Sequence, residues 1–281
     1  MKFTIEEITS RQNPYVGYVC KLAEKKHRDA ESKLRIDGKK LFFEAIKCDV
    51  ELESVLLTKE GLGKVSSALE ELDANVKVKL LSDNVFSKIT EEKSPEGVIC
   101  VAKHIDKFHK IVKINNEGDF SEIDALSGKS VFILESVRDP GNLGTVIRTA
   151  AAFGVDCIIM SDDCADIYNP KTIRAAMGNL FHQRIVRVDD LCKAIERLSA
   201  QGRRIFAATL GREAVMLGGE HLGALDCIAV GNEGHGLSEA AIEACGRKIL
   251  IPMMPDTESL NAAVASSICL WEQFGRELTK K

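Results

Sequence analysis

The 281-residue sequence contains no apolar run that approaches the roughly 20 residues of a membrane-spanning helix, and its first residues lack the form of a signal peptide. Its nine cysteines are odd in number and include no CxxC pair, which argues against a disulfide or zinc framework. The sequence also shows no cluster of metal ligands, no internal repeat and no low-complexity segment. These absences favour a cytoplasmic protein with reduced thiols and no bound metal.

Charge alone does not suggest a nucleic-acid partner, because the formal net charge is −4. Basic residues nevertheless gather between Lys21 and Lys40, where eight of them stand against four acidic residues. A stretch of this kind is typical of a solvated helix face. It becomes a candidate RNA-binding surface only if other features of the sequence indicate an enzyme that acts on nucleic acid.

The length suits two domains, and residues 1–102 read as a small α/β unit. Its expected helices run from Asn13-Pro14 to Ala30, from Asp37-Gly38 to Ile46 and between the first two strands, and its expected strands are Val55–Thr58, Val76–Leu81 and Val98–Ala102. Residues 103–129 are charged and rich in turn formers, so we expect a linker, part of which pairs as a strand or hairpin.

From residue 130 to residue 281, expected strands and helices alternate regularly. The strands are Val131–Glu135, Asp156–Ser161, Arg184–Val188, Arg204–Thr209, Cys227–Gly231 and Lys248–Ile251, and the helices are Leu143–Phe153, Pro170–Met177, Leu191–Ala200, Glu239–Ala244 and Leu260–Phe274. Apolar strands that alternate with helices indicate a parallel sheet covered on both faces. We therefore expect an α/β fold in which this larger domain follows the smaller one.

Three short segments lie where an expected strand gives way to a helix: Asp139–Thr149, Val230–Ser238 and Ile251–Asn261. Strand-to-helix edges are where α/β folds bind ligands, because backbone N–H groups point outward there. Together the segments supply polar residues that include Arg148, Glu233, Ser259 and three Asn, and several Gly, which is enough to build one polar site.

The first segment has a structural and a functional interpretation. Asn142 suits the N-cap of the helix that follows. Arg148 falls on the helix face that also carries Gly144 and Ala152, and these small residues leave open space around it. Such a guanidinium suits a substrate phosphate or hydroxyl, although the pattern alone does not choose between the two roles.

The other two segments also have simple structural interpretations. Gly231–Gly236 reads as a glycine-rich turn in which His235 is an exposed loop side chain. It is not a G-x-G-x-x-G phosphate loop, and Glu233 would repel a phosphate. Ser259 suits the N-cap of the last helix, whereas Asn261 has no such structural explanation.

In order, spacing and residue identity the three segments resemble the motifs of the SpoU/TrmH group of RNA ribose 2′-O-methyltransferases, within the SPOUT class. The resemblance implies a deep trefoil knot in the C-terminal α/β domain, against the rule that chains do not knot, and a homodimer with sites near its interface. Residues 1–102 are similar to a substrate-binding domain of the ribosomal protein L30e type. That similarity rests on Ile8–Pro14, on Ser94–Gly97 and on Arg35–Gly38, in which Asp37 replaces the usual Glu.

The resemblance also implies a role for each polar residue. The expected catalytic residues are Arg148, Asn142, Glu233, Ser259 and Asn261. The residues expected to hold the cofactor, S-adenosyl-L-methionine, are Gly231, Asn232, Gly234, Gly236, Ile251, Met253 and Leu260. A ribose 2′-hydroxyl is a poor nucleophile, so it must be held in line and its developing charge stabilised. A guanidinium is a poor base, so Arg148 suits that electrostatic role better than the role of a base, with Glu233 and Asn142 orienting it.

Three alternatives remain at this point. Ribosomal RNA suits the two-domain form better than transfer RNA, but only by analogy. Val131–Ser161 with Asp162 and Asp163 also reads as half of an NAD-binding Rossmann fold, although Gly141–Gly144 lacks the third glycine and follows Pro140. The third alternative is an RNA-binding protein without catalysis.

Overall fold

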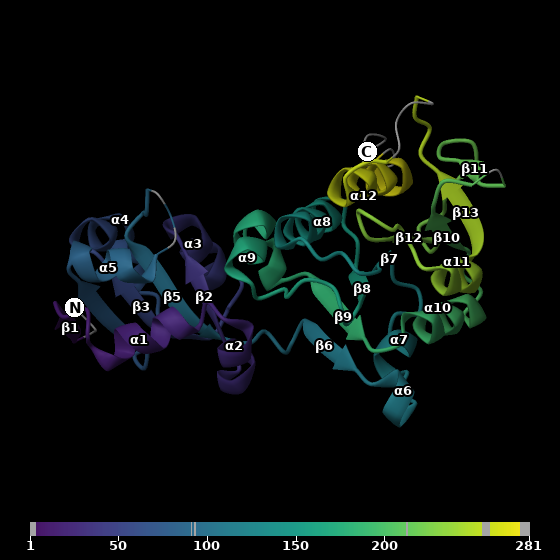
Figure 1. Ribbon diagram of the computed structural model, residues 1–281. Coiled ribbons are helices and arrows are strands. Elements are labelled where there is room, and N and C mark those ends of the chain that lie inside the picture. The colour runs from purple at the N-terminus through teal and green to yellow at the C-terminus, as the bar shows by residue number, and fades with distance from the viewer. Residues whose placement is uncertain (1–3, 91, 93, 212, 255–258, 276–281) are drawn as a thin grey trace. The chain divides into compact units, whose positions relative to one another are not determined.

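The computed structural model describes residues 4–90, 92, 94–211, 213–254 and 259–275, and the chain separates into two compact units. The first unit comprises Met1–Ile105 and Asp166–Phe181, and the second comprises Asp106–Ala165 and His182–Lys281. Figure 1 shows the helices and strands of each unit. Within the described ranges, no helix is long and apolar enough to cross a membrane.

The first unit is built on a five-stranded mixed sheet in the order β1-β4-β3-β5-β2. The strands are β1 (Ile5–Ile8), β2 (Lys33–Asp37), β3 (Leu52–Leu57), β4 (Lys77–Leu81) and β5 (Val98–Lys103). The helices are α1 (Pro14–Lys21), α2 (Lys25–Glu31), α3 (Lys39–Lys47), α4 (Lys59–Leu69), α5 (Asp83–Ile89) and α9 (Pro170–Ala176), with a 3₁₀ turn at Asn179–Phe181. Val16 and Val19 of α1 and Phe86 of α5 pack on the sheet in one apolar core.

One expectation for this unit is wrong, and strands β1 and β2 were missed. The single helix expected from Asn13 to Ala30 is two helices, because α1 ends at Lys21 and α2 begins at Lys25. The helix expected from Asp37-Gly38 to Ile46 is present as α3, and strand β2 comes just before it. Arg35 of β2 is only 1% exposed, pairs with Asp37 at 2.9 Å and donates a hydrogen bond to the Ile89 carbonyl. Buried charges of this kind hide the apolar alternation that identifies a strand.

The second unit is built on an eight-stranded sheet in the order β11-β13-β10-β12-β7-β8-β9-β6. Every pair in it is parallel, which confirms the expected parallel α/β fold. The strands are β6 (His109–Val112), β7 (Val131–Leu134), β8 (Cys157–Ser161), β9 (Arg184–Val188), β10 (Ile205–Ala208), β11 (Val215–Met216), β12 (Cys227–Val230) and β13 (Gly246–Leu250). The helices are α6 (Ile114–Glu117), α7 (Ser121–Asp124), α8 (Pro140–Ala152), α10 (Leu191–Ala200), α11 (Glu239–Cys245) and α12 (Ala262–Leu270), which continues as a π-helical turn at Trp271–Gly275.

Residues 106–129, most of the segment expected as a linker, carry regular structure. Strand β6 pairs in parallel with β9, and α6 and α7 follow it. The sequence did not show this strand clearly, because its Lys110 and its exposed Ile111 belong to an edge that is open to solvent.

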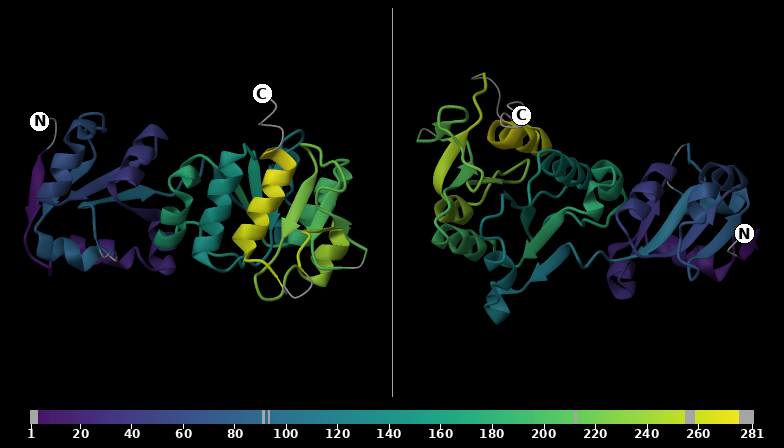
Figure 2. Two further views of the ribbon diagram at one scale, coloured as in Figure 1. Left: turned by 90° about the horizontal axis from the view of Figure 1, so that it is seen from above. Right: turned by 180° about the vertical axis from the view of Figure 1, so that it is seen from behind.

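Both faces of the larger sheet are covered. Apolar side chains of α10, such as Ile195, pack with Ile133 of β7 and Ala229 of β12 in one core. Helices α8 and α12 lie on the opposite face, side by side (Figure 2). Helix α8 follows β7 and α12 follows β13, and β10 and β12 lie between those two strands. The chain after β13 therefore returns across the carboxyl ends of two neighbouring strands before α12 begins.

Candidate active site

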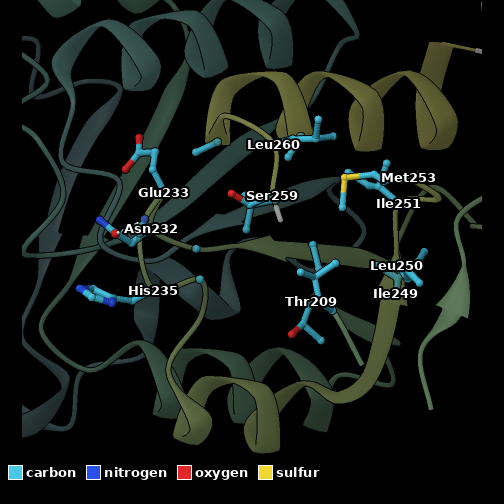
Figure 3. Close-up of a pocket in the computed structure, with 18 residues that line it drawn as sticks. Thr209, Asn232, Glu233, His235, Ile249, Leu250, Ile251, Met253, Ser259 and Leu260 are labelled. Carbon is cyan, nitrogen blue, oxygen red and sulfur yellow. Dashed lines mark hydrogen bonds between the residues drawn. The ribbon is translucent and has the colours of Figure 1, made fainter. Parts of the chain in front are cut away.

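The carboxyl ends of β10, β12 and β13 surround a pocket of about 390 Å³. Parallel neighbours end at the same edge of a sheet, so the loops that follow them meet there. The volume lies in the ~300–1,000 Å³ range of small-ligand sites. Figure 3 shows Asn232, Glu233 and His235 on one side, Ile249, Leu250, Ile251 and Met253 on the other, and Ser259 between them.

All seven residues expected to hold the cofactor line this pocket. The lining includes Gly231, Asn232, Gly234, Gly236, Ile251, Met253 and Leu260, together with Glu233 and Ser259. Residues 255–258 of the third segment lie outside the described residues. Thr209 and Leu210, after β10, also line the pocket and were missed. Only the position of β10 between β12 and β13 brings them there, and strand order is not visible in a sequence.

The loop after β12 is held in a tight shape by its own backbone. The N–H groups of Asn232 and Gly236 each donate to the other residue's carbonyl, at 3.0 and 2.9 Å. A Cβ on Gly231 would lie 2.2 Å from the Gly236 carbonyl carbon, so only glycine fits there. The Asn232 side chain donates to the Ser136 carbonyl at 2.8 Å, and this bond ties the loop to the segment after β7.

A chain of hydrogen bonds joins all three segments beside the pocket. The Asn142 side-chain amide donates to Oε1 of Glu233 at 2.5 Å. Nδ2 of Asn261 donates to Oδ1 of Asn142 at 3.1 Å. Three polar residues that are remote in sequence are thereby brought together.

The helix starts differ from the expectation and explain why these side chains are available. Helix α8 begins at Pro140, and its N-cap is Asp139, whose Oδ1 accepts from the Asn142 N–H at 2.9 Å. The side chain of Asn142 is therefore free to bond elsewhere. Helix α12 is capped by Asn261, which accepts from the N–H of Ala263, so the expectation of Ser259 as the cap is wrong. Asn261 has the structural role that the sequence did not reveal, and a contact to the site as well.

Arg148 is exposed on α8, roughly 9 Å along the helix axis beyond Asn142. It is not among the residues that line the pocket. Within the described part of the chain its side chain has no hydrogen bond or ion pair, and Glu233 and Asn142 bond to each other rather than to Arg148. Gly144, expected beside it, is buried, whereas Thr145 and Ala152 are exposed. The guanidinium is thus open to a partner from outside the chain.

The chemistry of the lining favours one kind of cofactor. The described lining contains no Lys or Arg to offset the charge of a pyrophosphate, and it includes the Glu233 carboxylate, which would repel one. Apolar side chains such as Ile251, Met253 and Leu260 suit an adenine ring and a thioether chain. This set fits S-adenosyl-L-methionine and does not fit a nicotinamide dinucleotide. No group of three or more potential metal ligands occurs among the residues that the structure describes.

Comparisons with known proteins agree with this geometry. The model of the SpoU rRNA Methylase family matches residues 129–271, and that of the MRM3-like substrate binding domain matches residues 13–100. A Bacillus subtilis relative, the 23S rRNA (guanosine(2553)-2′-O)-methyltransferase RlmP, is 30% identical over 96% of this chain and 100% of its own.

Solved structures are also similar over nearly the whole chain. An AdoMet-bound rRNA methyltransferase from Sinorhizobium meliloti has a TM-score of 0.81 and 28% identity, with 98% of each chain covered. An RNA 2′-O ribose methyltransferase has a TM-score of 0.79 and 27% identity, and the match covers 97% of this chain and 99% of that one. The chain therefore belongs to the SpoU rRNA methylase family.

Proposed function

We propose that this chain is an S-adenosyl-L-methionine-dependent methyltransferase that modifies a ribose 2′-hydroxyl in ribosomal RNA. The observation that carries the proposal is the hydrogen-bonded chain Glu233–Asn142–Asn261 beside a pocket whose described lining contains no Lys or Arg. The Bacillus subtilis relative is named for a guanosine of 23S rRNA, so large-subunit ribosomal RNA is the substrate to test first. Transfer RNA is the second candidate.

We assign the cofactor to the pocket of the second unit. The backbone of Gly231, Ile251 and Leu260 holds its adenine and methionine parts, and Asn232, Gly234, Gly236 and Met253 complete the walls. The bound cofactor supplies an electrophilic methyl group on a sulfonium. The Glu233 carboxylate is compatible with that positive charge, because opposite charges attract strongly in a partly buried site.

We assign Arg148 to the RNA. Its planar fork holds the phosphate and the hydroxyl of the target nucleotide, and its charge stabilises the oxygen as the methyl–oxygen bond forms. The hydroxyl proton leaves to water or to the phosphate. The roles of Asn142, Glu233 and Asn261 are to keep the three loops in one arrangement, and Ser259 shapes the pocket wall.

Residues 1–102 are proposed as the RNA-binding domain, 103–129 as the connecting segment and 130–281 as the catalytic domain. The match of residues 13–100 to a substrate binding domain supports the first assignment. The basic stretch needs one correction, because Arg28 and Arg35 are each only 1% exposed and pair with carboxylates. The candidate RNA-binding cations of this stretch are the exposed ones, among them Lys21, Lys25 and Lys26.

We further propose a trefoil knot, a homodimer and a cytoplasmic location. The return of the chain from β13 to α12, across β10 and β12, supports the knot. Val264 and Trp271, each 47% exposed, give the outer face of α12 an apolar surface that a second copy would cover. A light-scattering mass near 31 kDa at micromolar concentration, the mass of one chain, would contradict the dimer.

Two measurements test the function. Titration calorimetry should show binding of S-adenosylhomocysteine and none of NAD, and the reverse result would favour a dehydrogenase. Mapping of 2′-O-methyl groups on ribosomal and transfer RNA, from cells with and without the protein, should show one ribosomal position that depends on it. An unchanged map of both RNAs would contradict the proposal.

A further inference from the structure

The first unit has a pocket of its own, lined by α1, α2 and α5, with a volume of about 460 Å³. This volume also lies in the ~300–1,000 Å³ range of small-ligand sites. The residues that matter below are Gly17, Tyr18, Lys21, His27, Glu31 and Lys88. Residues 14, 17, 18 and 21 share one face of α1, while Val16 and Val19 point into the core.

Gly17 lies inside α1, where glycine is among the least favourable residues for a helix. Close packing inside the chain does not explain it, because a Cβ at this position would meet no atom within 4 Å. Its φ is not in the left-handed region either. The glycine instead leaves the α1 backbone open to whatever enters the pocket, which is the use of glycine at sites of close ligand approach.

Tyr18 supplies an aromatic wall next to this open backbone. Its ring centroid lies 5.5 Å from that of Tyr15, and Nζ of Lys33 lies 5.5 Å above its ring. Burial raises the pKa of Tyr18, so its hydroxyl stays protonated. A held aromatic ring beside a cation is the kind of surface on which proteins stack unpaired RNA bases.

The rim of the pocket carries positive charge. Lys21 and Lys88 are both exposed, and Nζ of Lys88 is held by the Arg11 carbonyl at 2.7 Å. Glu31 is the one carboxylate in the described lining, and His27 is half-buried opposite α1. Two exposed cations suit a phosphate, and the exposed Glu31 carboxylate suits the amino group of a base.

We propose that this pocket takes one unstacked nucleotide of the RNA substrate, with its base against Tyr18 and Gly17 and its phosphate near Lys21 and Lys88. The inference rests on the proposed function and deepens it, because it names the form of RNA that the first unit recognises. A base can enter such a pocket only from a loop, a bulge or a single strand. The first unit then selects unpaired RNA rather than a uniform duplex.

Gly17→Leu tests the pocket directly, because its Cβ would meet no atom within 4 Å and the rest of the side chain would take up pocket space. Gly63→Leu is the matched control, since Gly63 is an exposed glycine of α4 in the same unit and also has no atom within 4 Å of its Cβ position. The probe is ribosomal RNA from cells that lack the protein. Gly17→Leu should weaken its binding to the full chain by roughly tenfold, the scale of losing one stacked base, and Gly63→Leu should not.

Lys21→Glu is a second variant that does not alter the shape of the pocket, and Lys77→Glu, at an exposed position of β4, is its control. Ultraviolet cross-linking adds a direct readout, with a cross-link expected on residues 14–21. Wild-type affinity in both Gly17→Leu and Lys21→Glu, with melting temperatures unchanged, would overturn the proposal.

The outcomes separate this inference from the proposed function. RNA binding is read without methyl transfer, so a protein that binds but does not methylate would count against the function and leave the pocket supported. S-adenosylhomocysteine affinity should be equal in all four variants, since the cofactor pocket belongs to the other unit. A different outcome is that the wild-type protein binds guanosine or uridine monophosphate tightly while Gly17→Leu keeps full RNA affinity. In that case the pocket is a site for a free nucleotide, and the RNA assignment is wrong.

Discussion

Nδ2 of Asn142 donates a hydrogen bond of 2.5 Å to Oε1 of Glu233, although 91 residues separate the two in the sequence. Asn142 lies in the first turn of α8, after β7, and Glu233 lies in the loop after β12. Because β7 and β12 are neighbours in the sheet, their carboxyl ends bring the two side chains together. The bond thus links the first and second segments beside the pocket.

Replacing the two partners separately and together should show that they act as a unit. Asn142→Ala and Glu233→Ala should each slow single-turnover methyl transfer by roughly tenfold or more, since each leaves the other side chain without its partner. The double variant should be little worse than either single one. Glu243→Ala, an exposed position of α11, is the control. Fully additive losses would show that the hydrogen bond has no role in the reaction.

Arg148→Lys keeps the positive charge and removes the planar guanidinium, which can donate two parallel hydrogen bonds. Arg148 is exposed and without a partner among the described residues, so the free energy of unfolding should change by less than ~0.5 kcal/mol. Single-turnover methyl transfer should fall by roughly 10²-fold, the scale of losing one oriented donor. Arg197→Lys, which alters a surface ion pair with Asp124, is the control. Wild-type transfer by the Lys variant would remove Arg148 from the mechanism, and loss of the fold would make it structural.

The strands and helices of the second unit could be predicted largely from the sequence. The expected bounds of Arg184–Val188 and Leu191–Ala200 are those of β9 and α10, because their apolar periodicity is strong and their ends are marked by Asp and Gly. The family motifs also pointed to the loops that line the pocket. The sequence did not reveal β2, where charge is buried, and it indicated a strand between residues 103 and 129 without the bounds of β6, an edge strand with solvated residues.

Side-chain roles at helix starts could not be predicted in the same way. Asp139, Asn142, Ser259 and Asn261 are all good caps, and only the backbone decides which one caps and which one reaches the site. The contribution of Thr209 likewise depends on strand order. Sequence patterns report local preferences, whereas these features depend on neighbours that are remote in the chain.

Replacing Arg28 should lower the stability of the fold, whereas replacing the exposed lysines of the same stretch should weaken RNA binding. Nη2 of Arg28 pairs with Asp166 at 2.5 Å, and its other amino group donates to two carbonyls. Arg28→Met leaves a largely buried carboxylate unpaired and should cost about 3–5 kcal/mol of unfolding free energy. Lys25→Glu with Lys26→Glu should leave that free energy within ~1 kcal/mol, but weaken RNA binding and flatten its salt dependence. Urea unfolding and filter binding at several salt concentrations measure both effects, and an unchanged salt slope would make the stretch a solvated face.

Buried thiols should make the fold less stable at high pH. Burial raises the pKa of Cys164 and Cys227 to about 11 and that of Cys245 to about 12, whereas an unfolded thiol titrates near ~8.5. Above that value the unfolded chain releases protons that the folded chain keeps, so stability is complete below pH ~8.5 and is lost as the pH rises toward 11 or 12. Urea unfolding at pH 7.5, 9 and 10 measures the slope, and Cys164→Ala should make it shallower. Equal stability at all three pH values would show that these thiols are accessible in the folded state.

Gly231→Ala should remove the cofactor site, because the loop after β12 has no room for a methyl group. The new Cβ would lie 2.2 Å from the carbonyl carbon and 2.3 Å from the carbonyl oxygen of Gly236, and backbone atoms cannot move away as a side chain can. The Asn232–Gly236 hydrogen bonds must then open, and the loop loses the shape that lines the pocket. S-adenosylhomocysteine affinity should fall at least tenfold, or by about 1.4 kcal/mol.

Gly234→Ala is the matched control in the same loop. Its Cβ would lie 3.4 Å from Oδ1 of Asn232, which is the end of a side chain that can give way, and its backbone is not left-handed. This variant should therefore keep most of its affinity in calorimetry and most of its thermal stability. If Gly231→Ala bound the cofactor product as the wild type does and melted at the same temperature, the pocket after β12 would not be the cofactor site. The cofactor site would then lie away from the carboxyl ends of β10, β12 and β13.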